Sequence, residues 1–297
     1  MKRFLLSVLL FASLVGLCLA AVFAWRVGKQ QGALRKSLAV RPDQSILFIG
    51  DSHIGCSFVE EPRFHNRIVW ASSLPQSFTL MRLLDMERLG TLSPVRTLVL
   101  ELGVQNFGQH DSELLKVHTL RSLGFAWRHL DKVPLAPMEL YPFLITHLSG
   151  RMFIVDKPPT HTKSLLDQPE ALRQKDLRAT LDRAFKWHQH PETLAPNWQS
   201  ALKETFAEIQ ALCARHNIRV VCFTAPVSSF YREATPPEST ALLQHFADFL
   251  RARGIPYYDL SAWCEDRDFY DCTHLSLPAA ARFTERFYRE ILQEPID

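Results

Sequence analysis

A serine flanked by an aspartate and a histidine follows a short apolar run. The run Ser45–Phe48 leads into the pentapeptide Ile49–His53, which reads Ile-Gly-Asp-Ser-His. Strand carboxyl ends in open α/β sheets face a ligand crevice, and the N-terminus of a following helix offers N–H groups to a developing oxyanion. Ser52 is therefore a candidate nucleophile. Gly-Asp-Ser is equally typical of an ordinary turn, because all three residues favour turns.

A histidine and an aspartate that could activate this serine lie near the other end of the chain. Asp271 and His274 stand three residues apart, just before a helix-like run from Pro278 to Leu292. A serine hydroxyl becomes a good nucleophile when an imidazole accepts its proton and a carboxylate fixes the imidazole tautomer. In a turn, both side chains can face one crevice. A lone Asp-x-x-His is also typical of a surface turn that caps the next helix.

Together the two motifs resemble the SGNH, or GDSL, hydrolase superfamily. That superfamily combines a Gly-Asp-Ser block near the first strand with an Asp-x-x-His block near the C-terminus, and the blocks occur here in the same order. The resemblance implies that Ser52 is the nucleophile, His274 the general base and Asp271 its partner. It also implies the three-layer α/β sandwich of that superfamily.

The oxyanion-binding residues implied by this resemblance match less closely. The third block of the superfamily corresponds to the sequence Gly-Val-Gln-Asn that ends at Asn106, which implies Asn106 as a donor and Gln105 as its alternative. The second block corresponds to residues 70–76, where Pro75 cannot donate a hydrogen bond. Ser73 or a neighbour must then donate, together with the Ser52 amide. Losing one such donor costs about 100-fold to 1,000-fold in rate.

The same residues allow a metal-dependent interpretation. Asp51 and His53 match the Asp-x-His sequence that opens metallophosphoesterase sites, in which both side chains bind a metal. That chemistry needs further ligand sequences, Gly-Asp-x-x-Asp and Gly-Asn-His, and both are absent from the chain. We therefore expect neither a metal nor a cofactor. Asp51, His53 and Gln105 are instead expected to line the wall of the site.

Periodicity predicts an α/β fold. Strand-like runs occupy residues 45–49, 67–71, 97–102, 219–224 and 256–260, and helix-like runs occupy residues 78–89, 201–214, 241–250 and 278–292. Strands separated by helices pair in parallel. We predict a parallel five-stranded sheet flanked by helices, within a catalytic domain of residues 44–295 that carries a helical insertion at 108–196.

The N-terminal residues 1–28 predict a membrane segment. The stretch Phe4–Trp25 carries no charge and is long enough to cross a bilayer as a helix. A basic start, an apolar centre and small residues at Val22 and Ala24 also fit a cleaved signal peptide. The apolar length favours a single-pass anchor, followed by a linker at 29–43.

Two observations disagree on which side of the membrane the body of the protein lies. More basic residues follow the segment than precede it, which by the positive-inside rule favours a cytoplasmic body. Membrane-anchored proteins of the resembled superfamily that acylate teichoic acid or alginate place the catalytic domain outside, and we expect this orientation, periplasmic or extracytoplasmic. Cys264 and Cys272 would there form a disulfide, or else remain ordinary thiols.

Composition fits one folded enzyme domain. The chain has 297 residues, of which 47% are hydrophobic and 22% charged, so it can bury a full core. A net charge of +3 without interleaved basic and aromatic runs argues against nucleic-acid binding.

We therefore predict a serine esterase or O-acyltransferase that acts on acyl esters of cell-envelope glycans or lipids. The alternative is an inactive envelope component that keeps the fold, binds carbohydrate in the crevice or contacts an envelope protein partner through the insertion. An intact Ser, His and Asp favours the enzyme.

Overall fold

The computed structural model describes residues 35–70, 76–103, 162–185 and 198–296, with a few positions between 11 and 32. The chain divides into two compact units, one of residues 1–38 and 116–154, and the other of residues 39–115 and 155–297. The second unit contains the sheet and the residues predicted to form the triad.

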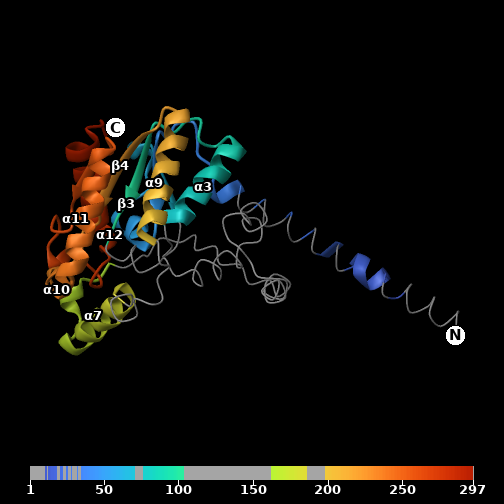
Figure 1. Ribbon diagram of the computed structural model, residues 1–297. Helices are drawn as coiled ribbons and strands as arrows, with labels where there is room; N and C mark the ends of the chain where they lie inside the picture. The colour runs from blue at the N-terminus through green and yellow to red at the C-terminus, as the bar shows by residue number, and fades with distance from the viewer. Residues whose placement is uncertain are drawn as a thin grey trace. The chain divides into compact units, whose positions relative to one another are not determined.

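Five parallel strands form the sheet of this unit in the order β2-β1-β3-β4-β5; β3 and β4 are labelled in Figure 1. Their bounds are β1 Ile46–Gly50, β2 Asn66–Trp70, β3 Thr97–Glu101, β4 Arg219–Thr224 and β5 Tyr257–Asp259. They match the five predicted strand-like runs, so the predicted parallel α/β sheet is confirmed. Every residue of β1 and β3 is buried, as expected for parallel strands covered on both faces.

Helices fill the intervals between the strands. Their bounds are α2 Ser52–Ser57, α3 Gln76–Leu89, α7 Glu170–Ala184, α9 Trp198–Arg215, α10 Ser229–Ala234, α11 Pro237–Ala252 and α12 Leu277–Phe287. Short turns of helix lie at η1 Pro62–Phe64, η4 Leu165–Asp167, η6 Asp266–Asp268 and η7 Tyr288–Leu292. The four helices predicted from periodicity are therefore present, as α3, α9, α11 and α12.

An aromatic core joins the sheet to α12. The sheet contributes Phe48 of β1 and Phe223 of β4 to this core, and α12 contributes Phe283 and Phe287 from one apolar stripe. The ring of Phe58, just after α2, lies 4.1 Å from that of Phe48 and 5.0 Å from that of Phe287 between centroids. This core therefore holds the first strand, the segment after α2 and the last helix together.

Hydrogen bonds fix the same three parts. The amide of Val59 donates to Thr284 Oγ1 at 3.1 Å, and the hydroxyl of Tyr288 donates to the backbone carbonyl of Phe64 at 2.6 Å. The helix after His274 is thus tied to the segment that follows Ser52.

Other helices pack in pairs. The helix α3 contacts α9, while α9 contacts β4 and α11 contacts β5; Figure 1 shows α3 and α9 side by side. Of the predicted insertion at 108–196, the described residues 162–185 form η4 and α7. The rest of that insertion lies outside the described residues.

The prediction of a membrane anchor at 1–28 falls largely outside the described residues. In the part of the chain that the structure covers, no helix has both the length and the apolar character needed to cross a bilayer. Cys264 and Cys272 are both free thiols, half-buried and buried respectively, so the structure shows the reduced alternative rather than a disulfide.

Candidate active site

Ser52 lies at the tight junction between β1 and α2. Asp51 caps the helix, because its Oδ1 accepts the backbone N–H of His53 at 2.8 Å. Gly50 has no side chain, and a Cβ atom there would collide with the side chain of Ile54, so glycine allows α2 to fold back closely on β1. Ser52 is therefore the first residue of α2, half-buried at the carboxyl edge of the sheet.

The Asp-x-x-His spacing forms a compact turn. Oδ1 of Asp271 accepts the backbone N–H groups of Thr273 and His274, both at 2.8 Å. The same carboxylate lies 2.8 Å from Nδ1 of His274 through its Oδ2 atom. Burial raises the pKa of Asp271, but the hydrogen bonds from His274 and the backbone outweigh it and hold that pKa below its usual value. Asp271 is therefore a carboxylate at neutral pH.

Two other parts of the chain hold this turn in place. The amide and hydroxyl of Ser228, after β4, donate to the carbonyl of Cys272 at 3.0 and 2.9 Å. The side chain of Gln168, between η4 and α7, donates to the carbonyl of Tyr270 at 2.7 Å. The Tyr270 ring stacks beside His274, with centroids 5.6 Å apart and an interplanar angle of 13°. The His274 imidazole is therefore held by the Asp271 carboxylate at Nδ1 and by the stacked ring of Tyr270.

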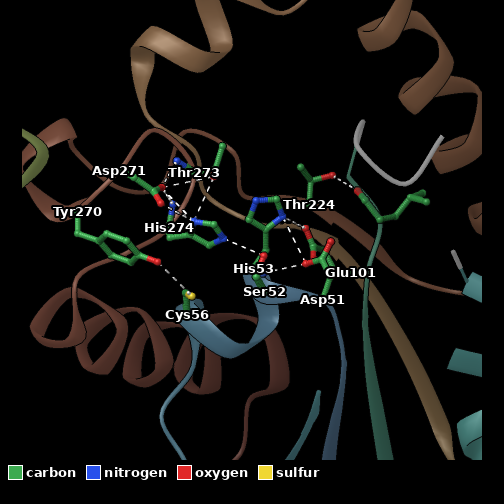
Figure 2. A network of polar contacts seen from close by, with 11 residues as sticks. Asp51, Ser52, His53, Cys56, Glu101, Thr224, Tyr270, Asp271, Thr273 and His274 are labelled. Atoms are coloured by element: carbon green, nitrogen blue, oxygen red, sulfur yellow. Dashed lines mark hydrogen bonds and ion pairs between the residues drawn. The ribbon is translucent and has the colours of Figure 1, made fainter. Parts of the chain in front are cut away.

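The two sequence motifs meet at this point. Nε2 of His274 lies 2.8 Å from Oγ of Ser52 (Figure 2). Because the carboxylate of Asp271 accepts the proton on Nδ1, Nε2 of the neutral ring carries the lone pair and accepts the Ser52 hydroxyl. The structure thus brings Ser52, His274 and Asp271 into one chain of hydrogen bonds. Such a chain can remove the serine proton as the oxygen attacks a carbonyl carbon.

A second buried cluster lies directly beside this chain. Nδ1 of His53 is 2.9 Å from Oε1 of Glu101, the last residue of β3, and 3.5 Å from Oδ1 of Asp51. Burial alone would lower the pKa of His53, but the carboxylates of Glu101 and Asp51 raise it to about 9. Burial and the neighbouring Asp51 raise the pKa of Glu101, whereas His53 holds the pKa of Asp51 below its usual value against burial. The cluster therefore carries an imidazolium beside the nucleophile.

The cluster has the residue types of a metal site. Among the described residues, Asp51, His53 and Glu101 are the single group of three whose candidate ligand atoms all lie within 4.8 Å of one another. In this structure, however, the Nδ1 atom of His53 hydrogen-bonds to Glu101, and Asp51 caps α2. These contacts occupy Nδ1 of His53 and Oδ1 of Asp51, two of the atoms that could bind a metal.

The structure covers the other predicted site residues only in part. Asp51 and His53, predicted as site walls, lie next to Ser52 but are almost fully buried. The predicted oxyanion residues Ser73 and Asn106, and the predicted wall residue Gln105, lie outside the described residues.

Sequence analysis missed Glu101 and Tyr270. Glu101 had a detectable signal, since it is a charged residue within the apolar run Thr97–Leu102 and at the strand end that faces the crevice. Tyr270 had no comparable signal, because stacking on His274 depends on the path of the loop.

Comparison with models of known protein families finds no match for the chain, and comparison with curated proteins finds none either.

Proposed function

We propose that this protein is a serine esterase or O-acyltransferase with Ser52 as the nucleophile, His274 as the general base and Asp271 as its orienting carboxylate. The observation that carries the proposal is the continuous path from Ser52 Oγ to His274 Nε2 and from His274 Nδ1 to Asp271, with 2.8 Å at each step. The resemblance of the two motifs to the SGNH superfamily supports the same roles.

The mechanism follows from these contacts. Ser52 Oγ attacks the ester carbonyl while its proton passes to Nε2 of His274, and Asp271 stabilises the imidazolium that forms. The Ser52 amide at the start of α2 is a donor for the oxyanion, and Asn106 is proposed as another. When the intermediate collapses, His274 returns the proton to the departing alcohol.

Hydrolysis and transfer share this chemistry. Water resolves the acyl-enzyme in an esterase, and a sugar hydroxyl does so in an acyltransferase. An anchor formed by residues 1–28 would place the domain at a membrane. Acyl esters of cell-envelope glycans or lipids are therefore the proposed substrates, and the domain is proposed to lie outside the cytoplasm.

The test uses the full-length protein purified in detergent. Wild type should be labelled by a fluorophosphonate and should hydrolyse p-nitrophenyl acetate, whereas Ser52→Ala and His274→Ala should do neither. Ser200→Ala, which changes an exposed serine of α9, is the matched control and should behave as wild type. Activity that survives Ser52→Ala would overturn the triad. A folded wild type that is neither labelled nor active would favour the carbohydrate-binding or partner-binding alternative.

A further inference from the structure

A second carboxylate–histidine pair stands beside the proposed triad. Nδ1 of His53 lies 2.9 Å from Glu101, much as Nδ1 of His274 lies 2.8 Å from Asp271. The proposed mechanism uses the second of these pairs and gives no role to the first. The buried imidazole of His53, with the carboxyl groups of Glu101 and Asp51 both at Nδ1, therefore has no role in the proposed mechanism so far.

The position of His53 brings it close to the reacting atoms. His53 follows Ser52 directly at the start of α2, and its ring centroid is 5.0 Å from that of His274. Since Nε2 of His274 is 2.8 Å from Ser52 Oγ, an acyl carbon bonded to that oxygen lies in the immediate neighbourhood of both rings. Figure 2 shows the His53 ring next to His274 and above Ser52.

The carboxylates fix which nitrogen of the His53 ring lies inside the cluster. Glu101 and Asp51 both lie at Nδ1, so this nitrogen carries a proton and points toward the end of β3. The other nitrogen, Nε2, lies at the opposite edge of the ring. In the imidazolium form both nitrogens are donors, so Nε2 then presents a charged N–H group away from Glu101.

The surroundings favour that charged form. Among the described residues, the ionisable groups that interact with His53 or with its neighbouring carboxylates are Asp51 and Cys56 around α2, Glu101 on β3, Tyr231 on α10, and Asp271 with His274 before α12. Burial raises the pKa of the Cys56 thiol and of the Tyr231 hydroxyl, so both stay neutral. The carboxylates, by contrast, raise the pKa of His53 to about 9. The ring is thus cationic over the neutral range.

Two backbone amides at the start of α2 are already hydrogen-bonded. The amide of His53 is used by the Asp51 cap, at 2.8 Å, and the amide of Gly55 bonds to the Asp51 carbonyl. The helix start therefore offers the Ser52 amide to an oxyanion. A cationic side chain in the same turn would add a stronger, charge-assisted hydrogen bond.

We propose that His53 is a fourth catalytic residue, which donates a hydrogen bond from Nε2 to the carbonyl oxygen of a carboxylic ester as that oxygen becomes an oxyanion, and that Glu101 and Asp51 position it. This inference rests on the proposed function. As Ser52 Oγ bonds to the carbonyl carbon, the π electron pair moves to the oxygen and the serine proton moves to His274. His53 keeps its proton throughout, and the electron pair returns when the bond to the alcohol breaks.

Two variants distinguish hydrogen-bond donation by Nε2 of His53 from a purely structural role of this residue. His53→Asn retains an amide near the position of Nδ1 and loses the donor at Nε2, while His53→Gln can place an uncharged donor near Nε2. We expect kcat/KM for p-nitrophenyl acetate to fall about 100-fold to 1,000-fold in His53→Asn, and clearly less in His53→Gln. The matched control is His216→Asn, since His216 also binds a carboxylate, that of Glu87, at 2.9 Å. It should stay within about twofold of wild type.

The pH profile supplies a readout that structural support alone would not change. Wild-type kcat/KM should decline as the pH rises through about 9, the pKa of His53, with Ser52→Ala as the blank and circular dichroism showing that the protein stays folded. This alkaline decline should be absent in His53→Gln. The wild-type profile tests the proposal even if neither variant folds.

The outcomes separate this inference from the proposed function. Ser52-dependent wild-type activity, with His53→Asn within about threefold of wild type or with no alkaline decline, would overturn the inference alone. An unlabelled and inactive wild type would overturn both. One equivalent of a divalent metal in the purified protein, lost in His53→Asn, would overturn the inference in favour of a metal site.

Discussion

Oγ of Ser52 lies 2.8 Å from Nε2 of His274, although 222 positions of the chain separate the two residues. The contact joins the turn after the first strand to the turn before the last helix. It depends on α12, which packs on the aromatic core beside α2 and is hydrogen-bonded to the segment after α2. The position of His274 relative to Ser52 therefore depends on how α12 packs on the aromatic core.

Asp271→Asn should abolish most activity without unfolding the protein. The asparagine amide would face Nδ1 with a donor, which disfavours the tautomer that leaves Nε2 free to accept the Ser52 proton. We expect kcat to fall about 10³-fold to 10⁴-fold. Asp248→Asn, at a surface aspartate that pairs with Arg251, is the control. An Asp271→Asn enzyme within tenfold of wild type would show that the carboxylate has no orienting role.

Gly50→Ala should disturb the serine turn. The new Cβ would collide with Ile54, so α2 would have to move, and overpacking of this kind costs about 1–3 kcal/mol. Urea denaturation should show this loss, and fluorophosphonate labelling of Ser52 should slow in parallel.

A double-mutant cycle tests the cause of this effect. Because Ile54→Ala removes the atoms that collide, Gly50→Ala should cost less stability in that background than in wild type. Equal costs in both backgrounds would mean that the collision with Ile54 is not the reason for glycine at position 50.

Thr284→Val should weaken the tie between α12 and the segment after α2. The variant keeps the shape of the side chain but leaves the amide of Val59 without its acceptor, so the free energy of unfolding should fall by about 1–3 kcal/mol. Thr240→Val changes an exposed threonine of α11 and should have little effect. Chemical denaturation measures both, and equal stability of the two variants would contradict the prediction.

The stability of the protein should decrease as the pH rises from 6.5 to about 9. Folded His53 keeps its proton up to a pKa of about 9, whereas the unfolded chain releases it near 6.5, so the folded state binds more protons in this window. At about 1.4 kcal/mol per pKa unit, the loss is on the order of 3 kcal/mol. The raised pKa of Glu101 acts in the same direction.

Urea denaturation at pH 6, 7.5 and 9 measures this dependence. His53→Asn should flatten it, and His216→Asn, which changes a surface histidine, should not. A wild type whose stability is constant or rises over this range would show that His53 is not held as a cation in the folded state.

The sequence by itself determined the strands, most of the helices and the two motifs. Apolar runs and helical periodicity are local patterns, so β1 and α12 could be predicted without knowledge of their neighbours. The Asp271–His274 pair is local too, since the turn that joins the two side chains is made by hydrogen bonds within three residues.

Only the tertiary structure decided which of these groups meet. Ser52 reaches His274 because the parallel sheet brings the loops at its carboxyl edge together and α12 packs against α2. Glu101 reaches His53 because β1 and β3 pair with Ile49 opposite Leu100, which sets Glu101 beside the turn that begins α2. Strand register and helix packing depend on contacts between residues that are far apart in the sequence. The spacing of residues within one motif therefore does not reveal them.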